Sequence, residues 1–285
     1  MLSSVPVDDA DDIALRHLRA DRTHLRGRAG TPAVFGSGPA VIGHRGLGAG
    51  VVDGHRQNTM ESFAAAVRSG ARWVEADVRR LGDDTLVVAH DASYPDGTCL
   101  ADVPSEEAVR RGTLPLRTLL DELPVDIGVN MDLKSSMADC LRPPVRTTAG
   151  LLGPVVAEES GRRPVMVSSF DPAALQMLRA EAPKVPLGLL TWYRFPVEMA
   201  VAACAHMDLE VLALHVGSIW DDSHGEPLDL PGIDSLLRIL HQCGRQLLVW
   251  CPDNATVRAL VDAGTDAVVV DDVPGALAAV RATSS

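Results

Sequence analysis

Hydrophobic and polar positions follow one another in a repeating order from about residue 39 onward. Short apolar runs rich in Val, Leu and Ile are followed by longer segments with apolar residues at every third or fourth position, the patterns of buried strands and amphipathic helices. The apolar runs predict eight strands, at 40–44, 73–78, 127–134, 165–170, 186–192, 211–216, 246–251 and 266–272. The periodic segments predict helices, among them 59–70, 171–183, 231–244 and 254–264.

The spacing of these strands favours a closed parallel barrel. Each strand and the segment after it take about 31 residues, close to the size of one strand–helix repeat. An open doubly wound sheet is the alternative, but the first strand is followed by GHRGLGAG instead of the G-x-G-x-x-G fingerprint of dinucleotide-binding sheets. We therefore predict an α/β fold, a (β/α)8 barrel over residues 39–285. An N-terminal helical arm over 1–38 and a short insertion after the second strand would complete it.

Composition and charge narrow the classes of partner. With 285 residues, 46% of them hydrophobic, the chain can bury a large core. The net charge of −12 argues against nucleic-acid or anionic-membrane binding, because both rely on excess Lys and Arg. An anionic substrate would have to meet locally placed cations or a metal ion.

The remaining sequence features point to the cytoplasm. The five cysteines include no C-x-x-C pair, so they suggest neither a disulfide framework nor a zinc site. The N-terminal residues do not resemble a signal peptide, and no apolar run is long enough to span a bilayer. We expect a cytoplasmic protein without an integral membrane segment, and the sequence leaves its oligomeric state open.

Polar side chains recur where the predicted strands end, which is where barrel enzymes carry their chemistry. One histidine on an apolar strand is usually a core residue, but polar residues at the same end of eight strands predict a site. In chain order these residues are His44, Arg45, Glu75, Asp77, Asn130, Asp132, Lys134, Ser168, Ser169, Trp192, His215, Trp250, Asp271 and Asp272. His90 closes an extension of the second strand.

Glu75 and Asp77 form an acidic pair on the second predicted strand. Two residues apart, they face the same side at about 7 Å and would repel each other by on the order of 2 kcal/mol. Asp132 on the neighbouring strand would complete three oxygen ligands for a hard divalent cation, Mg²⁺ or Ca²⁺. The alternative is that these carboxylates only form ion pairs, with Arg45, Arg79 or Lys134.

The ordered motifs resemble the glycerophosphodiester phosphodiesterase family. IGHRG, followed by NTMESFAAAVRSGARWVEADVRRLGDDTLVVAHD, is similar to its H-R-G, E-N-T, small-residue helix, E-x-D-V and V-x-H-D signature. The likeness continues in LPLRTLLDELP, NMDLK, SSF, VWCPDN and GTDAVVVDDVP, and covers about residues 40–275. The resemblance implies a TIM barrel, in agreement with the repeat count.

The resemblance also implies a role for seven residues. It gives metal ligands as Glu75, Asp77 and Asp132, an acid/base pair as His44 and His90, and phosphate-binding cations as Arg45 and Lys134. By analogy with related barrel phosphodiesterases, His44 is the hypothesised base and His90 the acid. The nucleophile could be the glycerol 2-hydroxyl of the substrate, giving a cyclic phosphate, or a metal-bound water.

The chain departs from the family pattern at four points, two before the second strand and two after it. Gln57 stands where the family has Glu, which could weaken the metal site or the fixing of Arg45. Asp132 replaces the commoner Glu. The 44–58 loop is longer than the family norm and glycine-rich, and it brings His55 and Arg56 as candidate extra phosphate contacts. The insertion after His90 is short and leaves a more open mouth for bulkier diesters or lysolipid head groups.

Trp192 and Trp250 are candidate substrate-binding residues. Their aromatic faces could line an apolar or choline-binding pocket, or they could simply plug the barrel.

We therefore expect metal-dependent hydrolysis of small-molecule glycerophosphodiesters, such as glycerophosphocholine or glycerophosphoethanolamine, to sn-glycerol 3-phosphate and an alcohol. The alternatives are a lysophospholipase D or sphingomyelinase D-like activity on lipids, or a weakly active, regulatory barrel because of Gln57.

Overall fold

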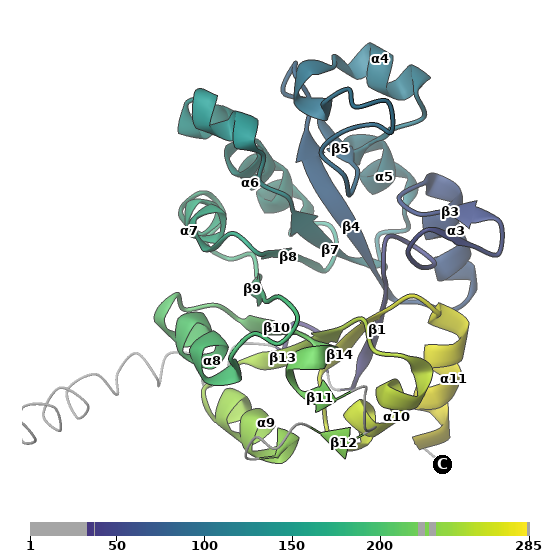
Figure 1. Ribbon diagram of the computed structural model, residues 1–285, viewed down its shortest axis with the longest axis vertical. Helices are drawn as coiled ribbons and strands as arrows, with labels where there is room; N and C mark the ends of the chain where they lie inside the picture. The colour runs from purple at the N-terminus through teal and green to yellow at the C-terminus, as the bar shows by residue number, and fades with distance from the viewer. Residues whose placement is uncertain (1–32, 37, 222–225, 228–231, 284–285) are drawn as a thin grey trace, which may run out of the picture.

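The computed structural model describes residues 33–36, 38–221, 226–227 and 232–283. Eight parallel strands form a closed ring (Figure 1), because the first strand pairs with both the last and the second. In order around the ring they are β1 (Ala40–Gly43), β4 (Trp73–Arg80), β7 (Gly128–Leu133), β8 (Val165–Ser169), β9 (Leu187–Leu190), β10 (Val211–His215), β13 (Gln246–Trp250) and β14 (Ala267–Val270). The predicted (β/α)8 barrel is confirmed, and all eight strands fall within the predicted ranges or extend them by two residues.

Helices cover the outside of the ring (Figure 1). They are α3 (Met60–Arg68), α5 (Leu116–Glu122), α6 (Thr148–Glu159), α7 (Pro172–Glu181), α8 (Val197–His206), α9 (Ile233–Gln242), α10 (Asn254–Asp262) and α11 (Val273–Thr283). Local sequence explains where they begin and end. The Asp171 side chain accepts hydrogen bonds from the amides of Ala173 and Ala174 at the start of α7. Gly70 follows α3 with a φ of +105°, a conformation that favours glycine.

The two-residue period of β4 divides its side chains between two environments. Val74, Ala76 and Val78 pack into the layer between strands and helices. Trp73 faces the barrel interior, where its ring meets Phe35 edge-on at 5.4 Å. Glu75 and Asp77 continue this inner row toward the C-terminal end of the strand, where the predicted site lies.

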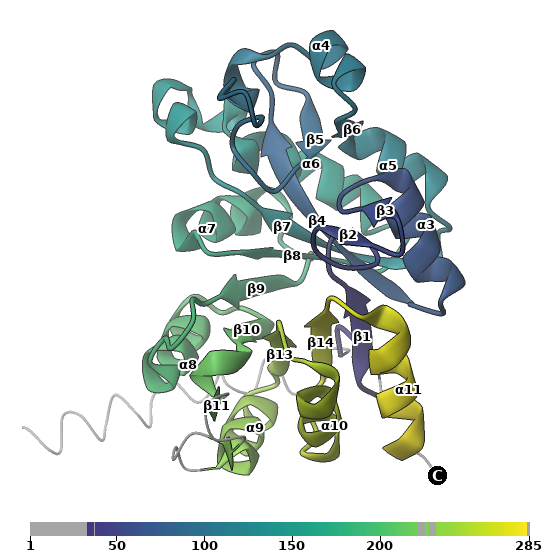
Figure 2. The ribbon, with the colours of Figure 1, turned by 45° about the vertical axis from the view of Figure 1, so that its right-hand side comes forward.

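Two segments extend the barrel beside β4 (Figure 2). Between β1 and α3 lies a hairpin of β2 (Val51–Val52) and β3 (His55–Arg56). After β4 the chain turns back into the antiparallel strand β5 (Leu86–Val88), passes through α4 (Ser105–Arg110), and returns to β5 through β6 (Leu114–Pro115). His90 therefore follows an antiparallel extension of the second barrel strand, as expected.

Smaller elements complete the described chain. Short 3-10 turns occur at Leu100–Asp102, Met137–Leu141, Pro144–Arg146 and Val216–Ser218, and a hairpin of β11 (Trp220–Asp221) and β12 (Glu226–Pro227) follows β10. Most of the predicted N-terminal helical arm, residues 1–32 and 37, lies outside the described residues, so the arm stays a prediction.

Candidate active site

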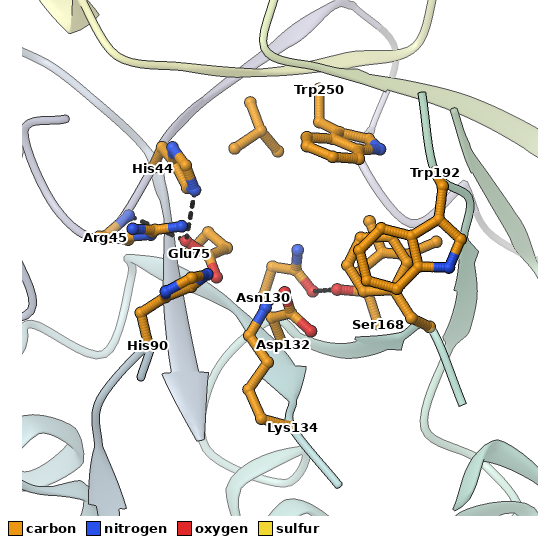
Figure 3. Close-up of a pocket in the computed structure, with 13 residues that line it drawn as sticks. His44, Arg45, Glu75, His90, Asn130, Asp132, Lys134, Ser168, Trp192 and Trp250 are labelled. Atoms are coloured by element: carbon orange, nitrogen blue, oxygen red, sulfur yellow. Dashed lines mark hydrogen bonds and ion pairs between the residues drawn. The ribbon is translucent and has the colours of Figure 1, made fainter. Parts of the chain in front are cut away.

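A cavity of about 120 Å³ opens at the C-terminal end of the barrel. Figure 3 shows His44, Arg45, Glu75 and His90 on one side of it, Trp192 and Trp250 on the other, and Asp132 between them. The predicted site residues that line it are His44, Arg45, Glu75, His90, Asp132, Lys134, Trp192 and Trp250. Asp77, the remaining one, lies buried beside them.

Three buried carboxylates form the acidic cluster, defined here as Glu75, Asp77 and Asp132. Each offers one oxygen atom that lies within 4.8 Å of the other two. The register explains the convergence, because Asp77 on β4 lies directly opposite Asp132 on β7. The side chains are almost inaccessible, with residue exposures of 4%, 0% and 6%.

Two cations neutralise part of this cluster. The Lys134 ammonium lies 3.0 Å from Asp77 Oδ1 and donates a hydrogen bond to Asp132 Oδ2. Arg45 Nε lies 3.2 Å from Asp77 Oδ2. The ion-pair alternative therefore holds for Asp77 and Asp132, but no ion pair joins Glu75 to either cation.

Three oxygens of the cluster are buried without a hydrogen-bond partner among the described residues: Glu75 Oε1, Asp77 Oδ1 and Asp132 Oδ1. Asp77 Oδ1 lies 3.0 Å from the Lys134 ammonium, so Glu75 Oε1 and Asp132 Oδ1 are the two with neither a hydrogen bond nor an ion pair to a cation of the described chain. A buried oxygen without a donor costs about 1–3 kcal/mol, and more when it is charged. The unpartnered oxygens and the all-oxygen donor set fit a divalent cation.

The pKa values of the cluster also indicate more negative charge than Arg45 and Lys134 compensate. Burial and the charges of Asp77 and Asp132 raise the pKa of Glu75 well above its ordinary value. Burial, aided by Asp77 and opposed by Lys134, raises the pKa of Asp132 to about 7. Burial would raise the pKa of Asp77 as well, but Lys134 and Arg45 outweigh it and lower that pKa. A cation at the cluster would favour the ionised form of all three.

His44 is held by a carboxylate from the other end of the chain. Its Nδ1 lies 2.7 Å from Asp271 Oδ1, and its Nε2 lies 4.0 Å from Glu75 Oε2. The same Asp271 oxygen accepts a hydrogen bond from the backbone amide of Ala49. Although partial burial would raise the pKa of Asp271, the contact with His44 lowers it. Because Asp271 is ionised, Nδ1 of His44 carries the hydrogen and donates it.

His90 lies on the same side of the cavity as His44 (Figure 3). Its Nδ1 lies 2.8 Å from Asp91 Oδ1, and Arg79 Nε donates to its backbone carbonyl at 2.7 Å. Arg79, considered above as an ion-pair partner for the cluster, thus fixes the backbone of His90.

The family departure at Gln57 has a visible consequence. Gln57 Oε1 accepts hydrogen bonds from Arg45 Nη1 at 2.9 Å and from the Gly50 amide at 2.7 Å. Arg45 itself has a φ of +53°, and its backbone amide donates to Glu75 Oε2. Gln57 thus contacts Arg45 and lies outside the acidic cluster.

Asn58 and Asp271 are the site residues whose contacts sequence reasoning missed. The Asn58 side chain donates to Asp77 Oδ2 at 2.9 Å. The Asn-Thr motif marked its position in the chain but not this contact. The contact between Asp271 and His44 spans 227 residues of sequence, so no local pattern could indicate it.

Aromatic residues form the wall opposite the histidines. The Trp192 ring stacks on Phe170 at 4.0 Å, and Trp250 meets the same ring edge-on. Trp192 is 62% exposed, so it lines the mouth and does not plug the barrel. His215 packs edge-on against Trp250 and accepts from the Gly217 amide, which places it behind this wall.

Among the described residues, no helix is long and apolar enough to cross a membrane.

Comparisons with known proteins give consistent matches. A model of the glycerophosphoryl diester phosphodiesterase family matches residues 44–274. The glycerophosphodiester phosphodiesterase of Caldanaerobacter subterraneus subsp. tengcongensis is 26% identical over 253 residues, 81% of this chain and 93% of that protein. The probable glycerophosphodiester phosphodiesterase 2 of Mycobacterium tuberculosis is 26% identical over 231 residues, 75% of this chain and 81% of the relative.

The fold has similar solved structures. An Oleispira antarctica phosphodiesterase in complex with the product sn-glycerol-3-phosphate superimposes with a TM-score of 0.65 and 23% identity, over 85% of this chain and 97% of that one.

Proposed function

The chain belongs to the glycerophosphoryl diester phosphodiesterase family, a family of phosphoric diester hydrolases, and from that premise we propose how its site works. The proposed reaction is hydrolysis of glycerophosphodiesters, such as glycerophosphocholine or glycerophosphoethanolamine, to sn-glycerol 3-phosphate and an alcohol. One observation supports it above all: buried carboxylates with unpartnered oxygens lie beside two histidines and two cations. The product bound to the Oleispira antarctica relative agrees with this choice.

Glu75, Asp77 and Asp132 would hold the divalent cation. Carboxylate oxygens alone suit a hard ion, Mg²⁺ or Ca²⁺. When bound, the ion would offset negative charge on the phosphoryl oxygens.

Arg45 and Lys134 would bind the phosphate from the protein side. Both line the cavity, and both are anchored by Asp77. Anchoring reduces the entropy lost when the side chains engage the anion, so charge is in place before the substrate arrives.

The two histidines would move the protons. With Nδ1 of His44 donating to Asp271, its Nε2 is free to accept a proton from the attacking hydroxyl, which makes His44 the base. His90, partly exposed and paired with Asp91, would donate a proton to the leaving alcohol. The attacking hydroxyl would come from the glycerol 2-position or from water.

Lysophospholipids are a second candidate substrate class, favoured by the exposed aromatic mouth. Trp192 lines the cavity and is 62% exposed, and Tyr193, the next residue in the chain, is 54% exposed. An acyl chain on the glycerol could lie along these rings, because apolar contact there would remove them from water. Lysophosphatidylcholine is the probe for this class.

The test is release of glycerol 3-phosphate from glycerophosphocholine by the full chain. We expect release with Mg²⁺ or Ca²⁺, loss with EDTA, and recovery when the cation is added back. No cation-dependent release of glycerol 3-phosphate from a panel of glycerophosphodiesters, together with no release of choline from lysophosphatidylcholine, would overturn the proposal and favour a regulatory barrel. His206→Ala, an exposed position on α8, is the control histidine variant.

A further inference from the structure

A second cavity, here called the polar groove, lies beyond His90. Its volume is about 400 Å³, more than three times that of the cavity lined by His44 and Glu75, here called the catalytic cavity. It lies between the β2–β3 segment and residues 88–113. His90 lines both cavities, so the groove begins at a residue of the proposed acid/base pair. Nothing in the reaction described above uses this space.

We infer that the polar groove binds the alcohol half of the diester and selects a polyhydroxylated ring, a hexose or an inositol. The inference rests on the proposed function, in which His90 protonates the leaving alcohol. The leaving oxygen must lie next to His90 to receive its proton, so the rest of the alcohol extends away from that residue. The groove is the space that continues from His90. The glycerol half then faces the aromatic wall.

Arg56 provides hydrogen-bond donors at this position. Its Nη2 donates to the Gly112 carbonyl at 3.2 Å, which connects the two segments that enclose the groove. Within the described part of the chain no carboxylate pairs with Arg56, as the ion pairs there involve other arginines. The guanidinium has five donors in a fixed plane, so most of them are left for the hydroxyls of a ligand.

Other groove residues supply acceptors and a flat wall. Asp91 and Ser93 are exposed on the lining, and Thr113 Oγ1 lies 2.8 Å from the Tyr94 hydroxyl. The Arg111 guanidinium covers the Tyr94 ring at 4.7 Å. The groove is also lined by apolar residues, among them Val51, Val88 and Leu100. A ring with several hydroxyls can meet such a mixed lining, because its hydroxyls bond to the polar groups while its C–H faces lie against the apolar ones.

The charges in the groove favour a neutral polyol over an anionic head group. Arg111 is already bound by two carboxylates, Asp96 at 2.8 Å and Glu107 at 2.5 Å. Asp91 adds a further negative charge at the entrance. Asp91 offsets the positive charge of Arg56, so the groove does not favour a head group that carries a negative charge in addition to that of the phosphate.

The test compares head groups on one enzyme. The full chain with its divalent cation is assayed for kcat/KM on glycerophosphoinositol and on glycerophosphoethanolamine. We expect glycerophosphoinositol to be preferred by at least about 10-fold. In Arg56→Ala, and in Ser93→Trp, which fills the groove from an exposed position, this preference should fall at least about 10-fold.

The matched control is Arg110→Ala, because Arg110 is an exposed arginine on α4 that does not line the groove. Its preference should equal that of the unaltered protein. No preference in the unaltered protein, or a preference that survives both groove variants, would overturn the inference.

A binding measurement separates this inference from the proposed function. Saturation-transfer NMR with free myo-inositol reports occupancy of the groove even if no diester is hydrolysed. Transfer that is seen with the unaltered protein and Arg110→Ala but lost in Arg56→Ala supports the groove. Absence of transfer to the unaltered protein overturns it, whatever the hydrolysis assay shows.

Discussion

Replacing Asp271 by Asn should slow the reaction by weakening the support of His44. The carboxylate accepts the Nδ1 hydrogen of His44 at 2.7 Å, which leaves Nε2 free to act as a base. An amide at this position is neutral and can also present its NH₂ group to Nδ1, which would favour the wrong tautomer. Asp271 does not line the catalytic cavity, so it is a positioning residue.

The magnitude follows from the exposure of the carboxylate. A hydrogen bond to a charged group contributes about 1.5–3 kcal/mol. The Asp271 side chain is 49% exposed, so water screens part of its charge and about 1–2 kcal/mol remains. This corresponds to a loss of about 5–30-fold in rate.

Steady-state kinetics across pH provides the assay. The loss in Asp271→Asn is expected in kcat with little change in KM, and the acidic limb of the pH–rate profile should move to lower pH. Asp272→Asn removes the neighbouring carboxylate, which contacts Asn254 and the Gly275 amide instead of His44, and should leave the profile unchanged. A wild-type kcat and profile in Asp271→Asn, or an equal effect of both variants, would refute the reasoning.

Three further outcomes test the rest of the site. His44→Ala and His90→Ala should each lower kcat at least about 10²-fold if they are the acid/base pair, and wild-type rates would remove those roles. In EDTA the free energy of unfolding should fall as pH rises from about 4 to 7, and it should fall more steeply than in Asp132→Asn. Burial raises the pKa of Asp132 to about 7, so over this range the folded protein keeps a proton that the unfolded chain releases. Unfolding temperatures measure this slope, and Mg²⁺ or Ca²⁺ should reduce it; an unchanged slope speaks against a cation there. Gln57→Glu should lower KM several-fold, because a carboxylate would anchor Arg45 more firmly than the amide that now accepts its hydrogen bond. Cation affinity should not change, because Gln57 lies outside the acidic cluster; tighter cation binding by titration would contradict this.

The sequence predicted the barrel and the acidic cluster for related physical reasons. Strands have a period of two, so the side on which Glu75 and Asp77 lie follows from their spacing alone. Parallel strands end at the same edge of a barrel, so Asp132 could be expected near them. Both inferences use local patterns, and the register of β4 with β7 agrees with them.

Contacts between distant segments could not be predicted in the same way. Sequence analysis placed Asp271 at the end of the last strand, but its bond with His44 depends on β14 lying beside β1. The polar groove needs two irregular segments to face each other, at Arg56 and Gly112. Neither segment has a periodic pattern from which the contact between Arg56 and Gly112 could be predicted.

The pairing of β4 with β7 affects both local unfolding of the protein and the substitutions that it can tolerate. Six consecutive residues of each strand are in register, and the acidic cluster lies within that ladder, so its amides should be among the last to exchange with deuterated solvent. The walls of the polar groove instead come from a hairpin and an irregular segment, where residues can be exchanged at little cost to the barrel. Head-group preference can therefore drift between related chains while the cation-binding strands stay as they are.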